Sequence, residues 1–276
     1  MAVKSAVAAG MLLLLNACGG GGSTDFPPVV TAFKVQTLQY SRPALIYIGG
    51  NDLRTSMTVE SGGVCTNPSF SSSSTTSLLV LTCTVAQVGE MPLTVKDANG
   101  KVLYQTSVTV PKPQVTLVTS SGSLTMELDP ASAPITVSNF LGYVNSGYYA
   151  STLFHRVIAG FVAQGGGYTT GLVKKAGQLA PITLESNKGL SNLRGTVAMA
   201  RTSDANSATS EFFVNLVANT FLDYQSAASP GYAVFGTVTQ GMDVIDAIAA
   251  LPTGTQNGVA NVPLTDVTIT SASQVK

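Results

Sequence analysis

The stretch Phe154–Gly167 reads FHRVIAGFVAQGGG and holds the only histidine of the chain. Apolar and polar residues alternate on both sides of a short turn, which predicts a β-hairpin. Successive side chains of a strand point to opposite faces, so we expect Phe154 and Arg156 on one face and His155 on the other. One surface would then offer a guanidinium, the amide of Gln164 and apolar groups. That combination suits an uncharged ligand with carbonyl groups, and it does not suit a phosphate or a metal ion.

The overall composition narrows the classes of function. The chain has 276 residues, of which 45% are hydrophobic and 10% charged, and its formal net charge is zero. It can therefore build a packed core, and it has no basic excess with which to neutralise a nucleic-acid backbone. The three cysteines are widely spaced and only one histidine could assist them, which disfavours a zinc site. We expect no cofactor, no metal and no nucleic-acid partner.

The first seventeen residues have the pattern of a secretory signal. Lys4 precedes an apolar stretch that is too short to span a bilayer, and this stretch ends in the sequence LNAC, Leu15–Cys18. The ending resembles a bacterial lipobox. The resemblance implies that residues 1–17 are a lipoprotein signal peptide, that cleavage occurs before Cys18 and that this cysteine is lipidated. An ordinary signal with an incidental cysteine is the alternative.

A glycine-rich segment follows the cysteine. Residues 18–25 contain GGGGS, so we expect a lipidated cysteine followed by a flexible tether. Such a tether suits a folded domain that is held at a membrane by acyl chains. Gly19 directly after the cysteine favours the outer membrane over the inner one. We therefore expect the protein in the cell envelope, lipid-anchored and facing the periplasm.

Residues 26–111 are rich in Ser, Thr and Val, in short alternating runs separated by turn signals. The sequence Asn99-Gly100 lies between two such runs and is a strong hairpin signal. Several short strands at this spacing predict a small antiparallel sandwich that is immunoglobulin-like in pattern alone. The predicted strands are 44–48, 56–60, 78–85, 93–96 and 102–110.

Two of the cysteines, Cys65 and Cys83, fall inside this segment. In an exported protein we expect them to form a disulfide. Closing a loop of this length contributes about 3 kcal/mol in the chain-entropy model. Two free buried thiols are the alternative.

The pattern changes after Pro111-Lys112-Pro113, which reads as a stiff linker, so we place a second domain at residues 112–276. Here many short strands accompany two helices, which predicts a closed barrel with helical caps and an all-β-dominated chain. Residues 168–181 are expected to form a polar loop. Besides the opening hairpin, the predicted strands are 114–119, 123–129, 195–201, 211–216, 231–239 and 267–273, and the predicted helices are 133–147 and 242–251.

Seven short motifs of this second domain follow one another in a recognisable order. They are FHRVI with GF at 154–161, QGGG at 164–167, GTVAMAR at 195–201, SATSEFF at 207–213, FLD at 221–223, YAVFG at 232–236 and GMDV at 241–244. With these motifs, the chain from Gln114 onward resembles a cyclophilin, a peptidyl-prolyl cis–trans isomerase, of the bacterial periplasmic type. The resemblance implies an eight-stranded antiparallel barrel capped by two helices, with an external groove for prolyl peptides. It does not extend to residues 26–110.

The same motifs imply roles for individual residues. Arg156, Phe161 and Gln164 would form the catalytic set. The substrate-binding residues would be Val162, Ala200, Arg201, Glu211, Phe213, Phe221, Leu222 and Tyr232.

Some positions depart from the best-studied pattern of the family. Val162 stands where Met is usual, Phe221 where Trp is common and Tyr232 where His is common. Glu211 stands where Gln is usual, and a carboxylate there could pair with Arg156.

Three other polar side chains are assigned no role in the chemistry. We expect His155 to be structural, because it would face away from the catalytic arginine and a lone histidine is no proton relay. Asp204 and Asp223 are expected to be solvated loop carboxylates without partners.

The chemistry that the resemblance implies needs no acid, base or nucleophile. The barrier to rotation about a peptide bond is about 18–20 kcal/mol, and the nitrogen of the twisted imide can accept a hydrogen bond. Arg156 could donate to that nitrogen only in the twisted state, so it would stabilise the transition state selectively.

The expected function is isomerisation of proline-containing unfolded or nascent envelope proteins by a monomer. One alternative is a cyclophilin-like binding or chaperone module with weak or no isomerase activity. Another is an envelope adhesin or assembly protein in which residues 26–110 do the main work.

Overall fold

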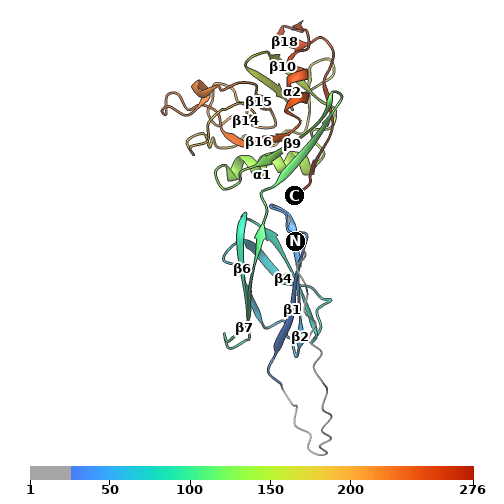
Figure 1. Ribbon diagram of the computed structural model, residues 1–276, viewed down its shortest axis with the longest axis vertical. Helices are drawn as coiled ribbons and strands as arrows, with labels where there is room; N and C mark the ends of the chain where they lie inside the picture. Colours follow the sequence, from blue (N-terminus) through green and yellow to red (C-terminus); the bar gives the residue numbers. More distant parts are fainter. Residues whose placement is uncertain (1–25) are drawn as a thin grey trace, which may run out of the picture.

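The structure is a computed structural model that describes residues 26–276. The predicted signal peptide, Cys18 and the tether therefore lie outside the described residues. Two β-rich bodies follow one another along the long axis of the molecule, with β1–β7 in one and β8–β19 and both α-helices in the other (Figure 1). Among residues 26–276, no helix has the length and apolar character needed to cross a bilayer.

The body formed by β1–β7 consists of two sheets, which we call the amino-terminal sheets. One has the strand order β1-β2-β5-β4 and the other the order β3-β6-β7. Every second side chain of β2 is buried, and these side chains share one apolar cluster with residues of the second sheet such as Met91 and Leu93. Two sheets that bury their facing sides in this way form a sandwich. The strands are β1 Val29–Gln36, β2 Pro43–Asn51, β3 Thr58–Glu60, β4 Cys65–Phe70, β5 Leu78–Val85, β6 Gly89–Lys96 and β7 Val102–Val110.

Two sequence predictions for this body are confirmed, and two of its strands were missed. Cys65 of β4 and Cys83 of β5 form a disulfide with a Cα–Cα distance of 5.6 Å. The hairpin turn between β6 and β7 contains Gly100 at a φ of 83°, which glycine adopts readily. Strands β1 and β4 lie at the two edges of their sheet, and their exposed positions weaken the apolar alternation that sequence reasoning depends on.

The second body is built on a closed antiparallel barrel with the strand order β10-β11-β15-β14-β16-β9-β8-β19. Closure removes the two free edges that an open sheet would expose. The expected eight-stranded barrel with two helices is thus confirmed. Its strands are β8 Gln114–Thr119, β9 Gly122–Leu128, β10 Thr152–Ile158, β11 Val162–Gly165, β14 Thr196–Met199, β15 Phe212–Asn215, β16 Val234–Gln240 and β19 Thr268–Gln274.

The helices lie close to their predicted positions. Helix α1 spans Pro134–Asn145, with proline in its first turn, and α2 spans Met242–Ala249. The side chain of Phe140 on α1 enters the aromatic core of the barrel, where its ring centroid lies 5.0 Å from that of Phe235 and 5.2 Å from that of Tyr149. The α1 helix therefore completes the barrel core from one side.

Two small hairpins were not predicted. One joins β12, Tyr168–Thr169, to β13, Val173–Lys174, inside the segment that was expected to be a polar loop. The other joins β17, Thr253–Gln256, to β18, Val259–Pro263. Asn257 donates to the backbone oxygen of Gly171 at 3.1 Å, which links the two hairpins.

The amino-terminal sheets contact the barrel body around α1 and β19. Tyr40 is only 5% exposed and belongs to the apolar cluster of the barrel. Its backbone oxygen accepts a hydrogen bond from Nε2 of Gln274 at 3.0 Å. Arg42 donates to Oδ1 of Asn145 at 2.6 Å. The predicted domain boundary at residues 111 and 112 falls between β7 and β8.

Candidate active site

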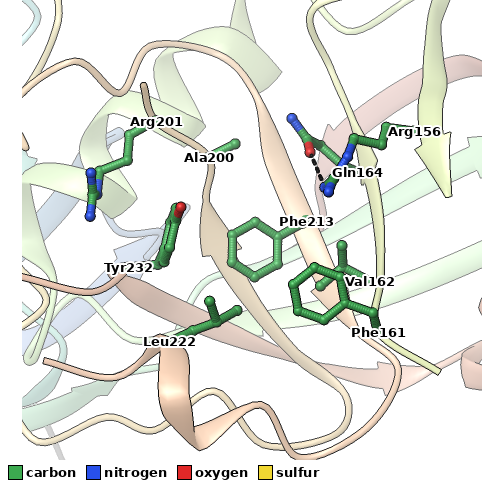
Figure 2. A pocket seen from close by; sticks show the side chains of 9 residues that line it. All are labelled: Arg156, Phe161, Val162, Gln164, Ala200, Arg201, Phe213, Leu222 and Tyr232. Atoms are coloured by element: carbon green, nitrogen blue, oxygen red, sulfur yellow. Dashed lines mark hydrogen bonds between the residues drawn. The ribbon is translucent and has the colours of Figure 1, made fainter. Parts of the chain in front are cut away.

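A cavity of about 380 Å³ opens on the outer face of the barrel. Figure 2 shows Arg156 and Gln164 on one side of it, Arg201 and Tyr232 on the other, and the ring of Phe213 between them. The lining is made entirely of residues that the sequence assigned to catalysis or substrate binding. They are Arg156, Phe161, Val162, Gln164, Ala200, Arg201, Phe213, Leu222 and Tyr232.

A β-bulge in β10 directs Arg156 toward this cavity. The register of β10 against β11 runs from Phe154 opposite Gly165 to Arg156 opposite Gln164, so one extra residue is inserted between the two pairs. The prediction that Phe154 and Arg156 share a face was therefore wrong. Phe154 is 1% exposed and packs in the barrel core, whereas the side chain of Arg156 lies outside.

The guanidinium of Arg156 is held by its neighbours on the hairpin. Its Nη1 donates to Oε1 of Gln164 at 3.1 Å, and its Cζ lies 6.0 Å from the ring centroid of Phe161 (Figure 2). No carboxylate is among the described residues that line the cavity. The guanidinium is thus oriented by a neutral amide and keeps other N–H groups for a ligand.

The floor of the cavity is apolar. Val162 and Phe213 are 2% and 4% exposed, and they share a buried cluster with Ala198 and Val234. This cluster lies on the outer side of the sheet and is separate from the barrel core. A floor of this kind accommodates a small apolar ring such as that of proline.

The far rim of the cavity carries a second arginine. The Cζ of Arg201 lies 4.6 Å from the ring centroid of Tyr232, a cation–π distance. Nε of Arg201 also donates to the backbone oxygen of Gly231 at 2.9 Å. The ring of Tyr232 packs edge-on against Phe213 at 5.6 Å, so the rim and the floor support each other.

Phe221 lies beside the cavity and does not line it. It is 63% exposed, and its ring stacks on that of Phe161 with a centroid distance of 5.8 Å and an interplanar angle of 17°. The 3-10 helix η1, Thr220–Leu222, carries Phe221 and also brings Leu222 into the cavity wall. Phe221 can therefore extend the apolar surface next to the floor.

Glu211 lies behind the cavity wall, and the ion pair predicted between it and Arg156 is not formed. Oε2 of Glu211 accepts a hydrogen bond from Nε2 of Gln164 at 2.9 Å and lies 3.2 Å from Nε2 of His155. Gln164 thus stands between the carboxylate and the guanidinium. Burial raises the pKa of Glu211, but the hydrogen bond and the charge of His155, with the hydrogen bond from Gln164, bring this pKa below its usual value.

His155 connects to the site indirectly. The residue is 4% exposed, and its ring lies 4.6 Å from that of Tyr168 in addition to its contact with Glu211. The structural role expected for His155 agrees with this burial. Its connection to Gln164 through Glu211 could not be seen in the sequence, because Glu211 is far from the other two residues along the chain.

The two aspartates that were expected to have no partners both have them. Oδ1 of Asp223 accepts from the backbone nitrogen of Asn192 at 2.7 Å and from Nδ2 of the same residue at 2.9 Å, and Oδ2 accepts from Ser191. Partial burial raises the pKa of Asp223, and the hydrogen bonds from Ser191 and Asn192 lower it below its ordinary value. Asp204 accepts from the backbone nitrogen of Asn206 at 2.9 Å. Asp204 thus closes its own loop, whereas Asp223 joins its segment to a loop 31 residues earlier in the chain.

Among residues 26–276, no cluster of three or more His, Cys, Asp or Glu side chains has a geometry that could hold a metal ion. The cavity therefore offers a ligand one anchored guanidinium, the backbone and side-chain polar groups of its walls, and an apolar floor.

Comparison with known proteins identifies this part of the chain. The family model for cyclophilin type peptidyl-prolyl cis-trans isomerase/CLD matches residues 114–274. The chain is 51% identical over 160 residues to peptidyl-prolyl cis-trans isomerase cyp18 of Streptomyces antibioticus, covering 57% of this chain and 96% of that protein. It is 46% identical over 161 residues to peptidyl-prolyl cis-trans isomerase B of Escherichia coli, covering 58% of this chain and 98% of that protein.

A solved structure supports the same architecture. A cyclophilin type peptidyl-prolyl cis-trans isomerase of Cryptosporidium parvum superposes with a TM-score of 0.50 at 24% sequence identity. The match covers 60% of this chain and 99% of that chain. At this level of identity the likeness concerns the fold of the barrel.

Proposed function

This chain belongs to the cyclophilin-type peptidyl-prolyl cis–trans isomerase family through residues 114–274, and we propose that it isomerises X–Pro bonds in unfolded or nascent proteins of the cell envelope. The two isomers of an X–Pro bond differ by only about 0.5–1 kcal/mol but interconvert in tens to hundreds of seconds. A catalyst of this step can therefore accelerate folding without changing its outcome.

The observation that carries the proposal is the position of a donor-only group beside an apolar floor. The ring of a substrate proline would lie on Val162 and Phe213, while the carbonyl that precedes it rotates. As the imide bond twists, its nitrogen becomes pyramidal and accepts a hydrogen bond from the guanidinium of Arg156. Because the planar ground state has no such acceptor, the interaction lowers the barrier and not merely the energy of the bound substrate.

The polar walls would hold the peptide during this rotation. Gln164 and the backbone near Ala200 and Arg201 border the cavity and can hydrogen-bond to an extended chain. Leu222 and Tyr232 close the pocket on the side away from Arg156.

We further propose that the enzyme is a lipid-anchored monomer facing the periplasm, held by Cys18 in the outer membrane. The LNAC ending of the apolar stretch and the GGGGS segment after it support this localisation. The Cys65–Cys83 disulfide agrees with it, because disulfides persist in oxidising compartments.

The alternative of a binding module with blunted activity rested on a fixed ion pair between Glu211 and Arg156. Since Glu211 contacts Gln164 and His155 instead, the guanidinium is not neutralised by it. No observation therefore favours that alternative over the isomerase.

The proposed function is tested with the form of the protein that starts at Thr24. Its effect on the cis–trans exchange of a proline-containing tetrapeptide is measured by NMR exchange spectroscopy, which needs no coupling protease. We expect exchange far above the uncatalysed rate. A correctly folded protein that leaves the exchange rate unchanged would overturn the proposal.

A further inference from the structure

Glu211, Gln164 and Arg156 form a hydrogen-bonded series, with the carboxylate at one end and the guanidinium at the other. Nη1 of Arg156 donates to Oε1 of Gln164 at 3.1 Å, and Nε2 of Gln164 donates to Oε2 of Glu211 at 2.9 Å. Nε2 of His155 lies 3.2 Å from the same carboxylate oxygen. Strands β10 and β11 and the residue directly before β15 contribute these groups.

The chemistry of the end groups allows only one orientation of the amide between them. A guanidinium has donors and no acceptor, whereas an ionised carboxylate has acceptors and no donor. Gln164 must therefore direct its oxygen to Arg156 and its NH2 group to Glu211. The flipped amide would place donor against donor on one side and acceptor against acceptor on the other.

We propose that Glu211 is a positioning residue for Arg156, which acts by selecting the amide orientation of Gln164 that holds the guanidinium at the cavity. The proposal rests on the isomerase function proposed above. A glutamine at position 211, the usual residue of the family, can present either its oxygen or its NH2 group, so it would select less strictly.

The surroundings of Glu211 are built to keep the carboxylate in place. Gly167 leaves room for it, because a Cβ atom at that position would lie 2.5 Å from Cγ and 2.6 Å from Oε1 of Glu211. The backbone of Gly167 has no positive φ, so the absent side chain, and not the backbone conformation, is what the position requires. His155 is buried, and its Nδ1 has no hydrogen-bond partner among the described residues, so Glu211 is the partner that its ring is shown to have.

A second, smaller cavity of about 160 Å³ is lined by residues of the same hydrogen-bonded series. Arg156 and Gln164 line both cavities, and the second one is also lined by His155, Tyr168 and Glu211. The titratable and charged groups that face Glu211 are His155 and Arg156 from β10, Tyr168 from β12 and Lys174 from β13. The hydrogen bonds of His155 and Gln164 hold the pKa of Glu211 below its usual value despite its burial, so the carboxylate is ionised near neutral pH.

Kinetics of variants at positions 211 and 164 test the proposal. Glu211→Leu removes the acceptor, and we expect kcat to fall about tenfold while KM stays within twofold. Glu211→Gln should restore kcat to about one third of the native value. In a Gln164→Leu background, Glu211→Leu should have no further effect. A kcat of Glu211→Leu within twofold of the native value, or an equal loss in both backgrounds, would overturn the proposal.

The pH profile gives a readout that a purely structural role would not produce. A protonated Glu211 has the same hydrogen-bonding options as a glutamine, so native kcat should fall about threefold as the pH drops through the pKa of Glu211, which lies below the ordinary value of a glutamate. The Glu211→Gln variant should show no such decrease. An identical acid limb in both proteins would contradict the proposal.

A measurement without substrate separates this inference from the isomerase function. Rotation of the Arg156 guanidinium is measured by ¹⁵N NMR in the native protein, in Glu211→Leu and in Gly167→Ala, whose Cβ atom would displace the carboxylate. We expect hindered rotation in the native protein and faster rotation in both variants. Gly142→Ala on α1, where the nearest atom to the new Cβ is 3.9 Å away, serves as the matched control. Equal rotation rates in the native protein and in Glu211→Leu would overturn the positioning role, even if the native protein proved inactive.

Discussion

The guanidinium of Arg156 donates to the side-chain oxygen of Gln164 at 3.1 Å, while its Cζ stays 6.0 Å from the ring centroid of Phe161. The charged group is thereby fixed at the edge of an apolar floor, and no carboxylate of residues 26–276 forms an ion pair with it. A donor that is already oriented does not need to be reorganised when the substrate bond twists.

Arg156→Ala is expected to lower turnover of a proline-containing peptide at least tenfold, because the twisted imide nitrogen loses its donor. Arg156→Lys should give an intermediate rate, since an ammonium can donate but lacks the planar fork that matches both Gln164 and the substrate. The rates are measured by exchange spectroscopy, and circular dichroism checks the fold. Undiminished activity of a folded Arg156→Ala protein would refute the mechanism.

Phe221→Ala is expected to raise KM about twofold to tenfold, because the exposed ring extends the apolar surface beside the cavity floor on which the peptide would lie. Phe221 is 63% exposed, so the free energy of unfolding should change little. Tyr224→Ala removes another exposed aromatic residue of the same segment, one that does not line the main cavity, and provides the control. Equal KM values for the two variants would argue against a role of Phe221 in peptide binding.

Asp223→Ala is expected to lower the free energy of unfolding by about 1–2 kcal/mol, because it removes the acceptor for Ser191 and for two nitrogens of Asn192. Asp223 directly follows Leu222, which lines the cavity, so KM should rise as well. Denaturant unfolding followed by circular dichroism and peptide kinetics give the two values. Asp204→Ala, on an exposed loop away from the cavity lining, is the control and should leave KM unchanged.

The lowered pKa of Glu211 predicts how the free energy of unfolding changes with pH. In the folded protein this pKa lies below its unfolded value, so the unfolded chain binds more protons in acid. The resulting stabilisation is fully present above the unfolded pKa and is lost as the pH falls through the folded pKa. The advantage in unfolding free energy of the native protein over Glu211→Gln should therefore shrink between pH 6 and pH 3. A constant difference over that range would show that the carboxylate gains nothing from His155 and Gln164.

Removal of the disulfide is expected to destabilise the amino-terminal sheets and not the barrel. The Cys65–Cys83 bond closes a separation of 18 residues, for which the entropic contribution is about 3 kcal/mol. The double variant Cys65→Ala, Cys83→Ala should thus unfold its sheets at lower denaturant concentration while it keeps its isomerase activity. A parallel loss of activity would mean that the barrel depends on the sheets for its own stability.

Much of the architecture could be predicted from local patterns. Strands β5 and β7 coincide with their predicted ranges, and α1 begins at the proline that marks its first turn. These elements have either a strict period or a strong end signal. The short hairpins β12–β13 and β17–β18 have neither, because strands of two to five residues are too short to show an apolar alternation.

The residues of the site could also be predicted from the sequence, whereas the hydrogen bonds between them could not. Nine of the proposed site residues line one cavity, as the order of the motifs implied. The bulge at His155 could not be predicted, because a bulge is a mismatch between two strands and leaves no signal in either strand alone. The partner of Glu211 was misassigned for a similar reason, since the register of β11 against β15 places Gln164 opposite Phe213, the second residue after Glu211.

The sequence by itself determined which side chains this protein has for its chemistry: one arginine on a hairpin, an amide directly before three glycines, and a set of apolar residues on other strands. These residue types are properties of the sequence and do not depend on how the chain folds. Only the tertiary structure decided that Arg156 is oriented by Gln164 and that Glu211 lies behind the amide and not beside the guanidinium. Hydrogen bonds act over about 3 Å and in one direction, so such pairings are set by strand register and barrel closure, which bring residues 47 positions apart into contact.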